Sequence, residues 1–161
     1  MNKSARRRSR EFALQALYQW QLAGHAPADL ERQYREADGF ASADAGLFLG
    51  VVGGVIRNAP ALEALLTPHI DRAFAELSPI ERAILLIGAY ELAEMPETPY
   101  RVILNESIEL AKSFGGTDGH KYVNGVLDKL APQARPQEVA APRATASRPR
   151  VSVKARRKTA T

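Results

Sequence analysis

The residues from 78 to 94 read SPIERAILLIGAYELAE, and they hold the clearest helix signal in the chain. Ser78 can accept hydrogen bonds from the free backbone N–H groups at a helix start, and Pro79 fits the first helical position. Glu81 stands where a capping box has its acidic residue. Apolar residues recur on the faces of the segment, and a pair of prolines follows it. We therefore predict a helix that runs to about Glu94.

Helical spacing also appears on both sides of this segment. Apolar residues three and four positions apart predict helices over 11–22, 44–56, 100–114 and 122–130. A shorter helix is expected between Pro27 and Gly39, and no long strand-like pattern occurs, so we predict an all-α fold. Gly50, Gly53 and Gly54 each weaken their helix by about 1 kcal/mol relative to alanine. We interpret them as positions of close packing.

The 161 residues carry a net charge of +4 that is unevenly distributed. Residues 1–10 hold +5 and residues 132–161 hold +7, whereas the body between them holds −8. Basic ends favour a polyanionic partner, and an acidic body favours a basic protein. Acidic helix faces that serve only solubility explain the body equally well. The chain has no cysteine, which excludes disulfides, thiolate metal sites and cysteine catalysis.

The composition changes sharply at Pro132. Residues 132–161 contain four prolines, no glycine and no aromatic residue. Such a segment buries too little apolar surface to offset its ordering entropy, so we predict a disordered basic tail after a helical domain over 1–131. The longest apolar run, 83–90, is too short for a membrane span, and no apolar signal segment follows the basic N-terminus. We therefore expect a cytoplasmic protein.

Residues that carry catalytic or metal chemistry are scarce. His25, His69 and His120 lie far apart and lack partners at metal-ligand spacing. Glu106 and Glu109 lie on one helical turn and could in principle exchange protons, but a solvated helix face explains them better. No phosphate-binding glycine loop occurs. We expect no enzymatic activity, no metal and no cofactor.

An arginine-rich stretch runs into the first predicted helix. Residues 6–10 read RRRSR, which supplies Arg6, Arg7, Arg8 and Arg10. Guanidinium groups bind phosphates and stack on bases, and so dense a cluster is costly unless a polyanion binds it. Tyr18 lies two turns further along, where an exposed ring could stack a base. We predict an RNA-binding surface here, and the alternative is a core tyrosine beside solvated arginines.

A second candidate for RNA contact precedes the last helix. Residues 114–124 read FGGTDGHKYVN, a glycine-rich turn followed by a helix start. Backbone N–H groups, Lys121 and Asn124 could meet phosphates or base edges there. Asp118 or Thr117 is expected to cap the helix, which alone would explain that residue. Tyr122 fits either a core or a stacking role.

Several segments in one order resemble the NusB family of bacterial transcription antitermination factors. They are RRRSRE at 6–11, ALYQWQ at 16–21, LSPIERAIL at 77–85, AYEL at 89–92, PYRVILNESIELAK at 99–112, FG at 114–115 and KYVNGVLD at 121–128. Together they cover about residues 4–131.

The resemblance implies a helical bundle of two packed subdomains, here about 4–66 and 70–131. It implies a non-catalytic protein that binds the boxA element of ribosomal RNA leaders together with NusE, the small-subunit ribosomal protein numbered ten. The complex joins RNA polymerase and other Nus factors and suppresses premature termination. The implied RNA surface consists of Arg6, Arg7, Arg8, Arg10, Tyr18, Phe114, Gly115, Asp118, Lys121, Tyr122 and Asn124. The implied surface for NusE consists of Glu76, Glu81 and Glu91.

Two alternatives belong to other classes of protein. A NusB-like domain also opens some ribosomal RNA cytosine methyltransferases, but no Rossmann-like segment or catalytic cysteine follows Pro132, so that enzyme is not expected. A helical scaffold that binds no RNA stays open. Titration with a short boxA-like RNA distinguishes it from an RNA-binding protein.

Overall fold

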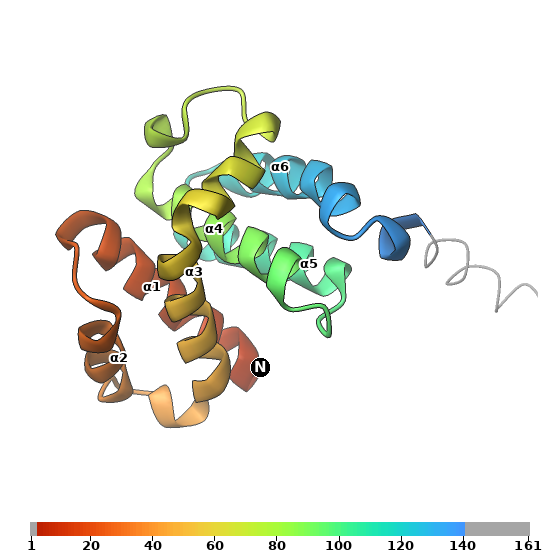
Figure 1. Cartoon of the computed structure of the whole chain (residues 1–161). Helices are drawn as coiled ribbons and strands as arrows, with labels where there is room; N and C mark the ends of the chain where they lie inside the picture. Colours follow the sequence, from red (N-terminus) through yellow and green to blue (C-terminus); the bar gives the residue numbers. More distant parts are fainter. Residues whose placement is uncertain (1–2, 141–161) are drawn as a thin grey trace, which may run out of the picture.

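The computed structural model of the chain describes residues 3–140, and within this range it consists of helices joined by short connections (Figure 1). The α-helices are α1 (Ala5–Ala23), α2 (Pro27–Arg35), α3 (Ala45–Leu66), α4 (Pro79–Glu94), α5 (Tyr100–Phe114) and α6 (Gly119–Ala134). Three short 3-10 helices are η1 (Phe40–Ser42), η2 (Thr67–His69) and η3 (Phe74–Glu76). No strand occurs between residues 3 and 140, which confirms the predicted all-α class.

Side chains cap three of the helix starts. The Ser4 hydroxyl accepts from Arg7 N at the start of α1, and Asp44 accepts from Leu47 N at the start of α3. The Ser78 hydroxyl accepts from Glu81 N at 3.1 Å, as the sequence predicts for α4. Only this half of the capping box forms, because the Glu81 carboxylate has no hydrogen bond to another described residue. The Glu81 carboxylate is therefore available for contacts outside the helix start.

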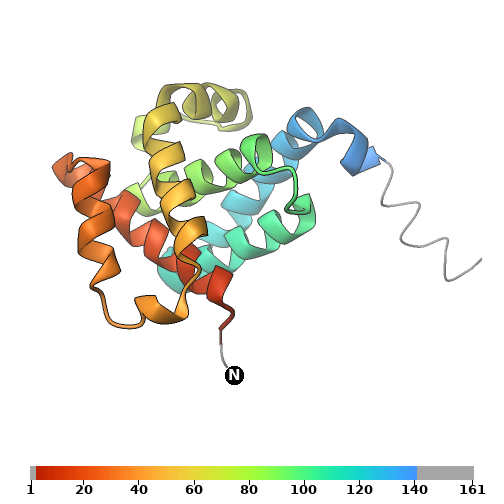
Figure 2. The ribbon, with the colours of Figure 1, turned by 60° about the horizontal axis from the view of Figure 1, so that its bottom comes forward.

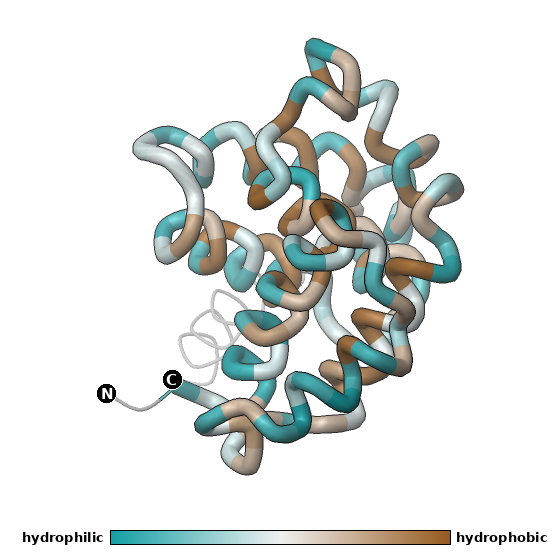
Figure 3. Tube along the Cα trace, turned by 90° about the vertical axis from the view of Figure 1, so that its left-hand side faces the viewer, coloured by the Kyte–Doolittle hydropathy of each residue, from teal (hydrophilic) through white to brown (hydrophobic). Residues whose placement is uncertain are grey.

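Helix α4 is the centre of the bundle. It contacts α1 and α3 on one side and α5 and α6 on the other, and every residue from 83 to 89 is buried. A helix that is apolar all round belongs in an interior. Hydrophilic and hydrophobic residues alternate along much of the trace (Figure 3), and the shorter α2 lies at the edge beside α1 and α3 (Figure 2). The buried apolar residues of all six α-helices form one continuous core.

The glycines of α3 differ in their surroundings. A Cβ added to Gly54 would overlap the ring of Tyr90 on α4, so the close-packing interpretation is confirmed there. No atom lies within 4 Å of a Cβ added to Gly50, so the close-packing interpretation is wrong at that position. The residues from Ala45 to His69 have the length and hydropathy of a membrane span, but the apolar face of α3 packs in the core. Core packing accounts for its composition.

The C-terminal part of the chain is ordered further than its composition suggests. Helix α6 continues through Pro132 to Ala134, and residues 136–140 are helical as well. The boundary predicted at 132 therefore lies too early, and the rest of the predicted tail, 141–161, lies outside the described residues. Prolines and polar composition suggested disorder, but Pro136 opens the last helical stretch, where a proline is tolerated. Polar side chains hold this segment in place together with Ala134 and Val139, which pack against the core.

Arg135 and Glu138 form a C-terminal clasp over the connection between α4 and α5. Arg135 is 8% exposed and donates to the carbonyl of Leu92 at 2.7 Å and to that of Thr98 at 3.0 Å. The Leu92 carbonyl is among the last four of α4, which lack partners inside the helix. Glu138 accepts from Tyr100 N at 2.7 Å, the first N–H of α5. The clasp thus satisfies the end of one helix and the start of the next.

Truncation at two positions should separate the clasp from the residues that follow it. Ending the chain after Ala131 removes Arg135 and leaves the carbonyls of Leu92 and Thr98 without this donor. The free energy of unfolding should then fall by roughly 2–6 kcal/mol, given about 1–3 kcal/mol for each such group. Ending it after Ala140 keeps every described contact and should leave that free energy unchanged. Denaturant unfolding measures both, and equal stability of the two truncated proteins would contradict this role.

Candidate nucleic-acid interface

A buried ion pair joins α1 to α4. Arg10 Nε lies 2.8 Å from Glu91 Oε2, and Nη2 lies 2.8 Å from Oε1, with the two side chains 3% and 1% exposed. Burial lowers the pKa of Arg10, but the hydrogen bonds and charge of Glu91, with the charge of Glu106, outweigh it and raise the pKa. The predictions that Arg10 contacts RNA and that Glu91 contacts a partner are therefore wrong. The helical repeat turns one of the four arginines inward.

Arg7 is held in the same network at the surface. Its Nε lies 3.0 Å from Glu106 Oε1 and its Nη2 lies 2.8 Å from Oε2. The hydrogen bonds and charge of Glu106 raise the pKa of Arg7. The Glu106 side chain is only 16% exposed and also lies 3.9 Å from Arg10 Nη1. Glu106 is thus a bridging carboxylate, and its interpretation as part of a solvated face is wrong.

The remaining cations of the N-terminal stretch lie close to Arg7. Arg6 is 3.5 Å from both the Asp44 carboxylate and the Thr98 hydroxyl, and Lys3 pairs with Glu11 at 2.8 Å. Arg8 is half-buried and has no ion pair within residues 3–140. We call Lys3, Arg6, Arg7 and Arg8 the N-terminal basic cluster. Most of its charges already have an acidic neighbour, which the sequence did not indicate.

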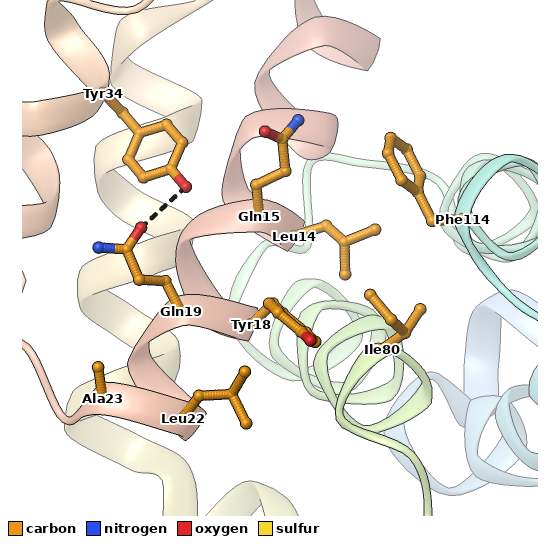
Figure 4. Close-up of a pocket in the computed structure, with 9 residues that line it drawn as sticks. All are labelled: Leu14, Gln15, Tyr18, Gln19, Leu22, Ala23, Tyr34, Ile80 and Phe114. Atoms are coloured by element: carbon orange, nitrogen blue, oxygen red, sulfur yellow. Dashed lines mark hydrogen bonds between the residues drawn. The ribbon is translucent and has the colours of Figure 1, made fainter.

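An apolar cleft of about 400 Å³ opens further along α1, where α1 faces residues of α2, α4 and α5. Figure 4 shows Tyr18 of α1 pointing toward Ile80 of α4, with Leu22 and Phe114 on either side. Tyr18 and Phe114 are each 38% exposed and Leu22 is 60% exposed, so the alternative of a core Tyr18 is wrong. Leu22 was not predicted to be a cleft residue, because its spacing marks it only as part of the helical repeat. Apolar side chains exposed together mark a contact surface.

The start of α6 lies beyond the cleft. Gly115 closes α5, and its N–H donates to the Ala111 carbonyl at 2.8 Å. Asp118 stands at the N-cap position of α6 but makes no capping hydrogen bond, so its expected capping role is wrong. It pairs instead with the exposed Lys121 at 3.6 Å. A Cβ placed on Gly119 would lie 3.5 Å from Glu81 Oε2, which puts Glu81 beside this turn.

Tyr122 lines a groove of about 270 Å³ between α6 and residues 69–71, which we call the basic groove. Its hydroxyl donates to Asp71 at 3.2 Å, and the Arg72 guanidinium lies 4.9 Å from its ring centroid. Burial raises the pKa of Tyr122, and the hydrogen bond from Arg72 lowers the pKa of Asp71. The groove is completed by His69, Lys121 and Lys129. His69, Arg72 and Lys129 were not predicted, since 69–72 lie far from α6 in sequence.

These features follow one path across the surface. Arg7 and Ser113 line the same small depression, the next residue, Phe114, lines the apolar cleft, and Ile80 lines it from α4. Glu81 follows Ile80, and Lys121 then leads into the basic groove. Asn124 is half-buried on α6, and Glu76 is exposed in η3. Most of the predicted contact residues thus lie along a band of cations, aromatic rings and interspersed carboxylates.

Comparison with known proteins identifies relatives over most of the chain. The sequence model described as the NusB family matches residues 7–132. A curated relative from Dechloromonas aromatica (strain RCB), named transcription antitermination protein NusB, is 58% identical over 86% of this chain and 85% of its own. The solved structure of T. maritima NusB is 28% identical, with a TM-score of 0.73 over 86% of this chain and 99% of that one.

A second solved structure shares the fold. It is titled as antitermination factors NusB and NusE in complex with double-stranded RNA. It is 21% identical to this chain, with a TM-score of 0.68 over 79% of this chain and 96% of the other. At this identity the likeness concerns the fold.

Removing one partner of the Arg10–Glu91 pair should destabilise the fold far more than breaking an exposed pair. Glu91→Ala removes both short hydrogen bonds of the buried Arg10 and leaves only Glu106 near it, at 3.9 Å. The free energy of unfolding should fall by roughly 3–5 kcal/mol. Asp29→Ala breaks the pair with Arg32 on α2, where both side chains are more than half exposed. That change should cost less than about 1 kcal/mol. Denaturant unfolding compares them, and similar losses would rule out a dominant role for the buried pair.

Proposed function

Because this chain belongs to the NusB family, we propose that it is a non-catalytic RNA-binding protein that acts in transcription antitermination. Antitermination is a regulatory activity, and it is the activity that the curated relative carries in its name. The family match over 7–132 contains every candidate RNA residue except Arg6. A bacterial transcription protein acts in the cytoplasm, where we place this one.

The observation that carries the RNA-binding part of the proposal is the band from the N-terminal basic cluster to the basic groove. Single-stranded RNA is bound by cations that follow its phosphates and by rings on which its bases stack. The band offers both kinds of group along one path. We propose that Arg6, Arg7, Arg8 and Lys121 contact phosphates. Tyr122, with Arg72 over its ring, is the candidate for base stacking in the groove.

Gly115, Asp118 and Asn124 complete the proposed RNA surface. They belong to the turn between α5 and α6 and to the first turns of α6. Asp118 neutralises Lys121 in part, because their exposed side chains lie 3.6 Å apart. RNA would have to compete with this weak pair. The proposed target is a single-stranded boxA-type element of ribosomal RNA leaders.

The apolar cleft also suits a protein partner, and for it we propose NusE. Large exposed apolar side chains beside carboxylates have the composition of a docking surface for a basic protein. Glu81 lies beside the cleft and has no hydrogen bond or ion pair from its carboxylate to another described residue, and Glu76 is exposed nearby in sequence. A structural neighbour is a complex of NusB with NusE and RNA. In this proposal Tyr18 and Phe114 pack on the protein partner or on bases, as part of an assembly with RNA polymerase and other Nus factors.

RNA titration over a range of salt concentrations tests the phosphate contacts. Each phosphate contact to single-stranded RNA contributes about −0.7 to the slope of log affinity against log salt. The double change Arg8→Ala and Lys121→Ala should therefore flatten the slope by about 1.4 on both boxA-like and scrambled RNA. Arg32→Ala, which removes a cation from exposed α2, is the control and should alter nothing. An unmodified chain that binds no RNA would favour the helical scaffold instead.

Partner binding tests the cleft separately from the RNA contacts. Glu81→Lys should weaken association with NusE, most strongly at low salt, because it reverses a charge that faces a basic protein. Glu36→Lys at the exposed end of α2 is the matched control. Tyr18→Ala assigns the ring: weaker NusE binding with unchanged RNA affinity indicates protein docking, and the reverse indicates base stacking. Unaltered NusE affinity in both folded variants would contradict this docking surface.

A further inference from the structure

Arg7 is bound to Glu106 through one edge of its guanidinium only. The hydrogen bonds at 3.0 and 2.8 Å use Nε and Nη2, which is the side edge of the group. Its Nη1 and the second hydrogen of Nη2 form the outer end of the group, which has no hydrogen bond to another residue within 3–140. The Arg7 side chain is 38% exposed. A guanidinium held in this way can still bind a phosphate with two parallel hydrogen bonds.

Glu106 itself is fixed in place. Its side chain is 16% exposed, and its Oε1 lies 3.9 Å from Nη1 of Arg10, which is buried by its pair with Glu91. A carboxylate between two cations and mostly shielded from water does not swing out to make way for a phosphate. An incoming anion therefore meets Arg7 already paired and oriented. This differs from Arg6, whose partner Asp44 is 37% exposed and lies 3.5 Å away.

From this geometry we propose that Glu106 is a positioning residue for RNA binding: it holds Arg7 by its side edge and leaves the outer edge ready for a backbone phosphate. The inference rests on the proposed RNA-binding function and deepens it. An arginine loses much side-chain entropy when it is immobilised by a ligand. Because Glu106 already immobilises Arg7 in the folded protein, little of this entropy is left to be lost when RNA binds. The raised pKa of Arg7 agrees with a guanidinium stabilised by this contact.

A double-mutant cycle on RNA affinity tests this role. Glu106→Ala should lower the affinity for a boxA-like RNA by roughly three- to tenfold, because the released Arg7 then loses side-chain entropy when it binds a phosphate. It should have no such effect when Arg7 is already replaced by alanine, since nothing is then left to position. The salt slope should flatten by about 0.7 when Arg7 is replaced, alone or in the double variant. It should stay near that of the unmodified chain in Glu106→Ala, because a mobile Arg7 still contacts its phosphate.

The matched control is Glu109→Ala. Glu109 lies one turn further along α5 and lines the same depression near Arg7, but it makes no hydrogen bond to Arg7. Its removal changes the charge equally, so RNA affinity should stay level or rise slightly as repulsion falls. Glu106→Gln keeps the side-chain volume and should bind RNA more weakly than the unmodified chain. Unfolding curves establish that each variant is folded, and both partners of the Arg10–Glu91 pair are kept in all of them.

The outcomes separate this inference from the function on which it depends. If the unmodified chain binds no RNA, the proposed function itself fails. If it binds RNA but Glu106→Ala raises the affinity both with Arg7 present and in the Arg7→Ala variant, Glu106 repels RNA and the positioning role is overturned. An equal loss in both backgrounds also overturns it, because the effect would then not pass through Arg7.

Discussion

Burying a charge in the middle of a helical bundle is possible only if its partner arrives with it, and the Arg10–Glu91 pair imposes that condition on the fold. Both side chains are almost fully buried, with two hydrogen bonds at 2.8 Å between them. Either charge alone would be costly in the core, so α1 can pack on α4 only in the register that brings the two together. Glu106 then lies beside Arg10 and fixes α5 against the same corner.

This network divides the N-terminal arginines between stability and binding. Arg10 lies in the interior, and Arg7 contacts the same network from the surface. Arg8 has no ion pair within the described residues. A basic stretch of this kind carries less available charge than its composition suggests. The proposed RNA surface therefore depends on which faces of α1 the network leaves outside, as well as on the number of arginines.

The sequence predicted the helices well because apolar spacing, helix caps and glycine stops are local signals. Ser78 caps α4 as its sequence indicates, and the exposed Tyr18 ring lies where the helical repeat puts it. Glu91 and Arg135 were misjudged for a common reason: charged residues are assigned to the surface unless a buried partner is known, and that partner lies far away in the sequence. His69 and Lys129 of the basic groove escaped notice because only tertiary packing brings their segments together.

The C-terminal clasp also affects when the protein can complete its fold during synthesis. The Leu92 carbonyl and the first N–H of α5 are satisfied by Arg135 and Glu138, which are synthesised much later than either helix. While the chain emerges from the ribosome, α4 can pack against α1 and α3, but its end stays incomplete until α6 and the residues after it have emerged. Folding of a domain as one unit during synthesis is then delayed to the last part of translation. A nascent chain that stalls before residue 135 would present an open end of the bundle to chaperones and proteases.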